Sequence, residues 1–177
     1  MANAAAATSG EAAADRFAQI YHTLFPPLYG YVHFRIGDRH VAEDITAQVF
    51  ERALSRITTV RQPDRLRPWL FAIARNAITE YRRKHRPTTD LDAPEAYAHL
   101  RIESPEMDAE RRDEWQRAVT YLTELTERER EVIGLKFVAE LSYREIGKVI
   151  GLSETNAGQI AHRAIGKLRQ RFAAEER

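Results

Sequence analysis

A helix-turn-helix pattern in the carboxyl-terminal third carries the side chains best suited to reading DNA. It begins at Tyr143, Gly147 supplies the small residue where two helices would cross, and Gly151 stands where the turn requires positive φ. The second helix is predicted to begin at Ser153 and to run to about Phe172. Apolar residues would hold it across the first helix: Ile146, Ile150, Leu152, Ala157 and Ile160. An ordinary helical hairpin would satisfy part of the same pattern.

The outward positions of that second helix have side chains that suit base edges and phosphates. Asn and Gln can pair bidentately with adenine, and Thr can contact the methyl group of thymine. Basic residues farther along would bind phosphates, which supply affinity rather than sequence selectivity, although singly such residues more often belong to a solvated helix face. Gly158 either admits a close DNA backbone or is simply tolerated. The candidate DNA-binding residues are Ser153, Thr155, Asn156, Gln159, His162, Arg163 and Lys167.

A second candidate group lies at the end of an amphipathic helix in the amino-terminal half. This helix is predicted to begin near Pro68 and to run into a basic cluster that Pro87 ends. Residues 61–87 hold eight basic and two acidic side chains, which suggests contact with a polyanion. The cluster could also be a solvated helix end, and Tyr81 could be a core residue. The candidate nucleic-acid-binding residues here are Arg75, Asn76, Tyr81, Arg82, Arg83 and Lys84.

The composition excludes several classes of protein. Of 177 residues, 44% are hydrophobic and 30% are charged, which excludes a wholly disordered chain. The absence of cysteine excludes disulfide scaffolds, thiolate zinc sites and cysteine nucleophiles. No apolar run approaches the roughly 18 residues needed to span a bilayer, and no secretory signal is recognised, so we expect a soluble cytoplasmic protein.

The sequence offers no arrangement typical of an enzyme. The six histidines are scattered, and neither a metal-spaced set of ligands nor a glycine loop for phosphate appears in the sequence. The acidic pair Glu43-Asp44 is alone on a helix and suits a surface or an interface better than catalysis. We therefore expect no enzyme activity, no catalytic residue, no metal, no cofactor and no small-molecule substrate.

Periodicity predicts an all-α protein made of two small helical domains. Residues 1–14 have nothing to bury and are expected to form a disordered tail, and 15–87 form the first domain. Residues 88–104 are expected to be a flexible acidic linker, and 105–177 form the second domain. No alternating β pattern appears, so no sheet is expected.

Caps and prolines mark the expected helix boundaries. Pro26-Pro27 should kink or interrupt the first helix, and Gly37-Asp38 is predicted to end it and to cap a second helix. Two capping boxes, Thr126–Glu129 and Ser142–Glu145, are predicted to open helices in the second domain, and Ser104-Pro105 is predicted to begin it.

Four segments, in this order, resemble the sigma-70 family of bacterial transcription initiation factors, and most closely its compact extracytoplasmic-function (group IV) sigma factors. Residues 41–53 resemble the helix that docks on core RNA polymerase, and 67–76 resemble the promoter-melting helix. Residues 125–132 resemble the opening of the carboxyl-terminal domain, and 141–163 resemble its helix-turn-helix. The order of these four matches over most of residues 15–172 is far more specific than any single motif.

The resemblance implies that the domain over 15–87 is sigma region 2, which binds core polymerase and melts and recognises the −10 element. The domain over 105–177 would be region 4, whose helix-turn-helix recognises the −35 element as duplex. Capturing an unpaired base requires unstacking it, and aromatic faces, amides and basic side chains suit that task. The candidate polymerase-binding residues on the docking helix are Asp44, Gln48, Glu51 and Arg52.

The partners implied are core RNA polymerase (its β′ and β subunits), promoter DNA and an anti-sigma factor, without membrane insertion. The acidic linker could thread into the polymerase or be a plain tether. The family often places Lys or Arg at the positions of Gly158 and Ile160, so base contacts there are not carried over.

One alternative function is a stand-alone helix-turn-helix regulator that binds duplex DNA through residues 142–172. That alternative explains the helix-turn-helix but leaves the basic residues of 75–86 and the acidic linker without a role. A sigma factor, by contrast, should direct specific initiation only when mixed with core polymerase.

Overall fold

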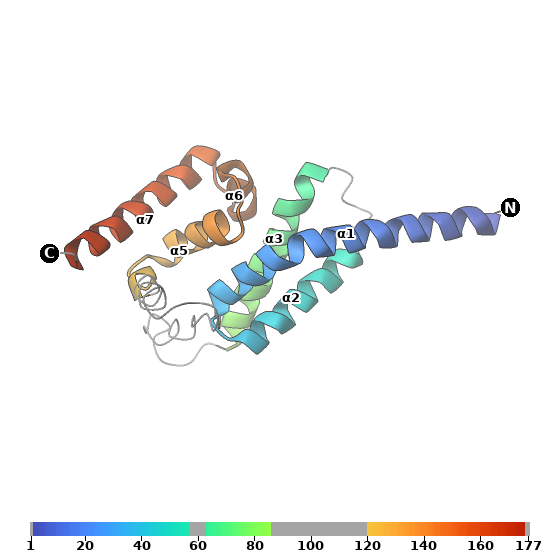
Figure 1. The fold of residues 1–177 in the computed structure, drawn as a ribbon, viewed down its shortest axis with the longest axis horizontal. Helices are drawn as coiled ribbons and strands as arrows, with labels where there is room; N and C mark the ends of the chain where they lie inside the picture. The colour runs from blue at the N-terminus through green and yellow to red at the C-terminus, as the bar shows by residue number, and fades with distance from the viewer. Residues whose placement is uncertain (1, 57–62, 86–119, 176–177) are drawn as a thin grey trace.

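The computed structural model describes residues 2–56, 63–85 and 120–175, most of which lie in helices (Figure 1). Within these ranges there is no strand. The predicted acidic linker over 88–104, the restart at Ser104-Pro105, and Arg86 and Pro87 lie outside the described residues. The elements are α1 (Ala2–Ile36), α2 (Arg39–Leu54), α3 (Pro63–Lys84), α5 (Glu127–Ile133), the π-helix η3 (Gly134–Val138), α6 (Tyr143–Ile150) and α7 (Glu154–Glu175).

The first three helices pack against one another as an amino-terminal unit. Gly37 ends α1 with a φ of 84°, and the Asp38 carboxylate accepts a hydrogen bond from the Val41 N–H at 2.9 Å, as the sequence predicted. The apolar stripes of the three helices supply side chains that are fully buried: Leu28, Tyr31, Val49, Leu70 and Phe71. This core fixes the outer faces of α2 and α3, which carry the candidate binding residues.

Two boundaries in this unit differ from the predictions. Helix α1 is not interrupted at Pro26 and Pro27, one of the two outcomes predicted there, because Leu24 and Leu28 on either side are buried in the core and hold the helix together. Helix α3 begins at Pro63 rather than near Pro68, since a proline suits the first turn and Pro63 satisfies that rule equally well.

The start of α1 also differs from the expected disordered tail over 1–14. The helix begins at Ala2, and in Figure 1 its first half projects beyond α2 and α3. Alanine has the highest helix propensity of all residues, so a segment with little to bury can continue a helix that is nucleated elsewhere.

The carboxyl-terminal unit confirms the predicted helix-turn-helix. Both capping boxes are present, with the Thr126 and Ser142 hydroxyls accepting from the N–H three residues later. Gly151 adopts the left-handed conformation at φ 71°, and a Cβ on Gly147 would lie 2.5 Å from the Leu152 carbonyl oxygen. The close crossing therefore requires glycine at position 147. The π-helix η3 was not predicted.

The two units are packed against each other rather than held apart. Helix α3 contacts α6, and α1 contacts η3, so one apolar core runs through both units. Phe34 of α1 is buried among residues of the other unit: Leu122, Leu125, Ile133 and Ala164. Two glycines allow this approach, because a Cβ on Gly134 would lie 2.8 Å from the Phe34 ring and one on Gly30 would lie 3.2 Å from Val138.

Candidate nucleic-acid interface

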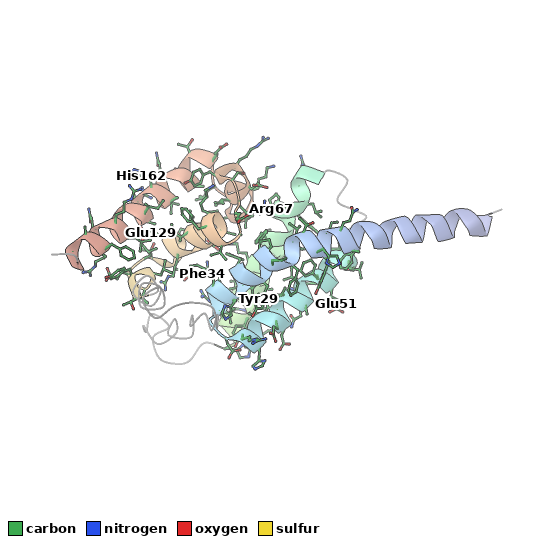
Figure 2. The ribbon with its side chains drawn as sticks, in the orientation of Figure 1. Tyr29, Phe34, Glu51, Arg67, Glu129 and His162 are labelled. Atoms are coloured by element: carbon green, nitrogen blue, oxygen red, sulfur yellow. The ribbon has the colours of Figure 1, made fainter. Side chains whose placement is uncertain are left out.

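The first four turns of α7, together with Ser153 just before the helix, present the predicted DNA-binding residues to solvent. Ala157, Ala161 and Ala164 face the core with no exposed surface, which turns the opposite side of the helix outward. Figure 2 shows His162 on that outer side. The exposed residues of this face are Ser153, Thr155, Asn156, Gln159, His162, Arg163 and Lys167.

Two of these seven side chains already have partners within the protein. The Ser153 hydroxyl accepts a hydrogen bond from the Asn156 N–H at 3.2 Å and so acts as a cap for α7. Lys167 Nζ lies 2.8 Å from Glu129 Oε1. Burial acts to raise the pKa of Glu129, but hydrogen bonds from Lys167 and Thr126 outweigh it and lower that pKa below its ordinary value. Lys167 therefore also fastens α7 to α5.

The predicted residues on α3 divide into two sets. Asn76 and Arg83 are exposed, and the half-buried Tyr81 ring stacks on His85 with centroids 4.2 Å apart. Lys84 is exposed and pairs with Glu80 one turn earlier, Nζ to Oε1 at 2.8 Å. These side chains form an accessible polar and aromatic surface at the end of α3.

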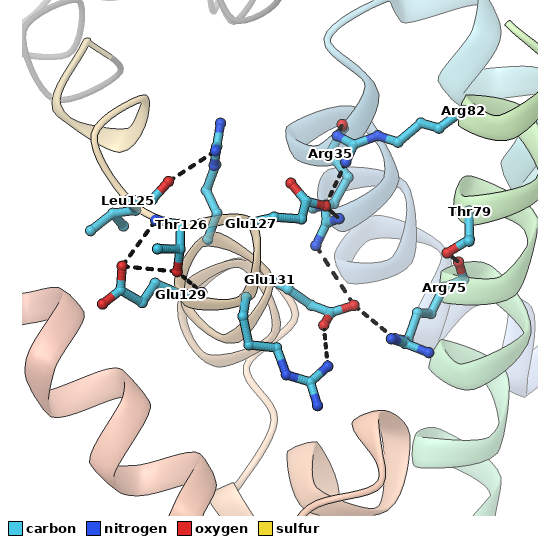
Figure 3. Close-up of polar contacts among 11 residues, drawn as sticks. Arg35, Arg75, Thr79, Arg82, Leu125, Thr126, Glu127, Glu129 and Glu131 are labelled. Carbon is cyan, nitrogen blue, oxygen red and sulfur yellow. Dashed lines mark hydrogen bonds and ion pairs between the residues drawn. The ribbon is translucent and has the colours of Figure 1, made fainter. Parts of the chain in front are cut away.

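Arg75 and Arg82, by contrast, are bound to the carboxyl-terminal unit (Figure 3). Arg75 Nε donates to Glu131 Oε1 at 2.7 Å, and Arg82 Nη1 donates to Glu127 Oε1 at 2.6 Å. Arg82 also donates to the Arg35 carbonyl oxygen. The structure thus separates these two arginines from the accessible part of the predicted basic cluster.

The predicted polymerase-binding residues share one exposed face of α2. Asp44, Gln48, Glu51 and Arg52 follow a helical spacing of four, three and one, and all four are exposed. Figure 2 places Glu51 at the outer edge of this helix. Among the residues that the structure describes, Arg52 is the member of this set with an ion pair to another helix, its Nη2 lying 3.9 Å from Glu80 Oε2, and all four side chains remain exposed.

Sequence reasoning missed the charged residues between the two units. Arg35, with a side chain 7% exposed, contacts both Glu127 and Glu131. Beside it, burial raises the pKa of Tyr31 to about 12, against the opposing effect of the Arg35 charge. The sequence patterns place Glu127 and Glu131 near the start of a helix, and no local pattern could reveal their contacts with arginines that lie between 45 and 96 positions away in the chain.

Two further properties apply to the described ranges alone. No group of three or more His, Asp or Glu residues there is arranged to hold a metal ion. No helix in the described part of the chain is both long and apolar enough to cross a membrane.

Comparison with protein families gives two matches that coincide with the two units. The family described as Sigma-70 region 2 matches residues 20–88, and the family described as Sigma-70, region 4 matches residues 121–170. Together they cover about two thirds of the chain, in the order that the sequence analysis expected.

Curated relatives agree with these matches over nearly the whole chain. The ECF RNA polymerase sigma factor SigM of Bacillus subtilis (strain 168) is 29% identical over 153 residues, which are 85% of this chain and 91% of SigM. The ECF RNA polymerase sigma factor BldN of Streptomyces coelicolor is 29% identical over 164 residues, which are 92% of this chain but only 61% of BldN.

A solved structure shares the fold. The structure of CnrH in complex with the cytosolic domain of CnrY has a TM-score of 0.65 and 24% identity, covering 93% of this chain and 94% of that one. The matched family regions coincide with the unit that holds α2 and α3 and with the unit that holds the helix-turn-helix. The curated relatives and the solved structure match across both units. The chain belongs to the sigma-70 family of RNA polymerase sigma factors, and the two relatives named above are ECF sigma factors.

Proposed function

We propose that this sigma factor binds core RNA polymerase through α2, opens and reads the −10 element with the end of α3, and reads the −35 element with α7. The observation that carries the proposal is the exposed polar face at the start of α7, inside the matched region 4 and directly after the turn that joins α6 to α7. That position is where a helix-turn-helix protein contacts base edges in the major groove.

Recognition of the −35 element would divide between two kinds of contact. Asn156 and Gln159 carry amides that can pair with adenine, and Thr155 can contact a thymine methyl group. His162 extends the same face one turn farther, whereas Arg163 would bind phosphate and fix the register. Ser153 and Lys167 are better explained as holding α7 in place, with DNA contact as a second role.

Opening of the −10 element is assigned to region 2. Asn76 and Tyr81 supply an amide and an aromatic face for an unpaired base, and Arg83 and Lys84 supply positive charge for its phosphates. Arg75 and Arg82 would join them once they are released from the carboxyl-terminal unit. The match of region 2 to residues 20–88 gives this half of the chain a role that a stand-alone DNA-binding regulator would not need.

The partners follow from the same assignment. The exposed face of Asp44, Gln48, Glu51 and Arg52 would bind a helix of the polymerase, with its charges complementing the partner's. The family resemblance supports an anti-sigma factor as a second partner and the cytoplasm as the place of action. A sigma factor of this kind contributes binding and strand opening, while the polymerase supplies the chemistry.

The test replaces the proposed base-reading side chains and measures promoter choice. Gln159→Ala with His162→Ala should change which −35 sequences are used by the reconstituted polymerase on a promoter library. Each lost bidentate contact should reduce the free-energy difference between the preferred base and its competitors by about 1–3 kcal/mol, because the altered helix can no longer distinguish those bases. Preferences within the −10 element should be retained.

The matched control is Gln170→Ala, an exposed glutamine three turns farther along α7. It should leave promoter choice as in the unaltered protein. If the double variant selects the same promoters as this control, α7 does not read the −35 element through Gln159 and His162.

A further inference from the structure

Arg128 of α5 reaches the last residue of α6, the first helix of the helix-turn-helix. Its Nη2 donates a hydrogen bond to the Ile150 carbonyl oxygen at 2.9 Å. Carbonyl groups in the last turn of a helix have no partner within that helix, and a cationic side chain can both bind them and favour the negative end of the helix dipole. Arg128 therefore holds the carboxyl end of α6 from a different element.

The other arm of the same guanidinium group is bound within α5. Arg128 Nη1 donates to Glu131 Oε2 at 2.8 Å, and the Glu131 side chain is only 8% exposed. A planar guanidinium group that is bound through both of its Nη atoms has its donor directions fixed. The hydrogen bond to Ile150 is thus made by an oriented donor rather than by a mobile surface side chain.

The carbonyl group that Arg128 binds belongs to the peptide bond at which the turn before α7 begins. The next residue, Gly151, has the left-handed conformation, and its N–H donates to the Gly147 carbonyl oxygen. Residues 151–153 alone separate α6 from α7. A displacement of the peptide bond after Ile150 therefore passes directly to the start of α7.

The residue that follows Arg128 holds α7 at a second place. Glu129 Oε1 lies 2.8 Å from Lys167 Nζ, beyond the middle of α7. Figure 3 shows Glu129 and Glu131 on different sides of α5. Two contacts that lie apart along a helix fix its direction as well as its position. Helix α5 thus braces α7 through consecutive residues, one at the turn before α7 and one along its length.

We propose that Arg128 is a positioning residue for recognition of the −35 element, because it sets the direction of α7 by holding the turn before that helix. The inference rests on the function proposed above for α7. Hydrogen bonds to base edges need particular distances and angles, so a small rotation of α7 would weaken those of Asn156 and Gln159 together. Arg128 is assigned no contact with DNA, and its effect passes through the Ile150 carbonyl group.

The experiment compares Arg128→Gln and Arg128→Lys with the unaltered full chain. Glutamine removes the charge and the forked donors, whereas lysine keeps the charge and a donor but lacks the planar fork. Promoter choice is measured with reconstituted polymerase on a library that is varied in the −35 and −10 elements. Amide hydrogen exchange of the free chain reports on the turn, and circular dichroism verifies that each variant is folded.

The matched control is Arg171→Gln. Arg171 also joins α7 to another part of the same unit, because its Nε donates to Glu124 Oε2, and the two side chains are 56% and 40% exposed. This variant loses the same charge and one ion pair of α7 but leaves the turn untouched. It should match the unaltered chain in promoter choice.

Arg128→Gln should reduce discrimination several-fold at every −35 base pair that α7 reads, because the helix moves as a body, while −10 preferences are retained. Arg128→Lys should lie between this variant and the unaltered chain. The N–H groups of Gly151 and Leu152, both bonded to the Gly147 carbonyl oxygen, should exchange faster in the same order, and those in the middle of α7 should not. The salt dependence of promoter binding should stay the same, since a residue without a phosphate contact releases no counterion.

Promoter choice in both Arg128 variants equal to that of the Arg171→Gln control would overturn the proposal. A salt slope lowered by about 0.9 in Arg128→Gln would also overturn it, because Arg128 would then bind a phosphate directly. So would a change in either −35 discrimination or exchange at the turn without the other. If Arg128→Gln does not fold, the same readouts in Arg128→Lys decide. An unaltered chain that shows no −35 preference with core polymerase would refute the proposed function itself, and this inference with it.

Discussion

The arginines of α3 illustrate how a side chain's function depends on residues far away in the sequence. Arg75 and Arg83 belong to the same basic segment, yet Arg83 is exposed whereas Arg75 is bound to Glu131. Composition and spacing were sufficient to identify the segment as a candidate for binding nucleic acid. They were insufficient to separate its members, because the glutamates that hold Arg75 and Arg82 come from another unit of the protein.

Gly158 offers a prediction about stability and DNA binding in one variant. A Cβ at this position would lie 3.7 Å from the Tyr143 ring, which is an ordinary contact. Gly158→Ala should therefore raise the free energy of unfolding by up to about 1 kcal/mol, since alanine is the better helix former. Denaturant unfolding would measure the gain in the free energy of unfolding. A loss of stability would show that the added methyl group does not fit against the Tyr143 ring. Promoter binding of the same variant decides whether the DNA backbone needs the space that glycine leaves.

His33 makes stability depend on pH. Its half-buried ring stacks on Tyr29, and burial lowers its pKa below 6.5, with Arg39 acting in the same direction and Asp38 opposing. The folded state thus favours the neutral imidazole. The resulting stability is fully present above pH 6.5 and is lost as the pH falls through the lowered pKa of the folded protein.

The matched variant for this effect is His33→Gln. Urea unfolding at a series of pH values should give a shallower decrease of the unfolding free energy below pH 6.5 than in the unaltered protein. The remaining histidines are common to both proteins and cancel in the comparison. Parallel curves would show that His33 does not titrate differently in the folded and unfolded states.

At the scale of single elements, local chemistry made the helix-turn-helix predictable. Both capping boxes, the left-handed Gly151 and the close crossing at Gly147 involve residues within a few positions of one another. The errors arose where packing outweighed local preference: burial of Leu28 carries α1 through two prolines. The π-helix η3 was not predicted, because its residue types do not distinguish a π-helical turn from an α-helical one.

The crossing of α6 and α7 gives a prediction at this scale. Gly147→Ala should reduce the free energy of unfolding by about 1–3 kcal/mol, because the added Cβ would lie 2.5 Å from the Leu152 carbonyl and the backbone must shift. The shift should also displace α7 and weaken selection of the −35 element. Thermal unfolding and promoter binding would measure the two effects.

Gly166→Ala is the matched change in α7, where a Cβ meets nothing within 4 Å. It should be neutral or stabilising through helix propensity. Equal loss of stability in both variants would mean that the tight crossing at position 147 is not the cause.

At the scale of the whole molecule, the sequence predicted two helical units but not their contact. Arg35 and Glu127 are 92 positions apart, and the glycines that admit Phe34 and Val138 have no local signature of that role. Periodicity reports which face of a helix is buried, not which unit buries it. The packing of the two units against each other therefore emerges only from the folded chain.

The most direct measurement of the central claim is run-off transcription with purified core RNA polymerase and the full chain on a library of promoters. We expect transcripts with defined start sites that depend on both components, from templates sharing one −35 and one −10 sequence. The account would be contradicted if the chain added no specific transcripts to those of core polymerase while binding duplex promoter DNA selectively by itself.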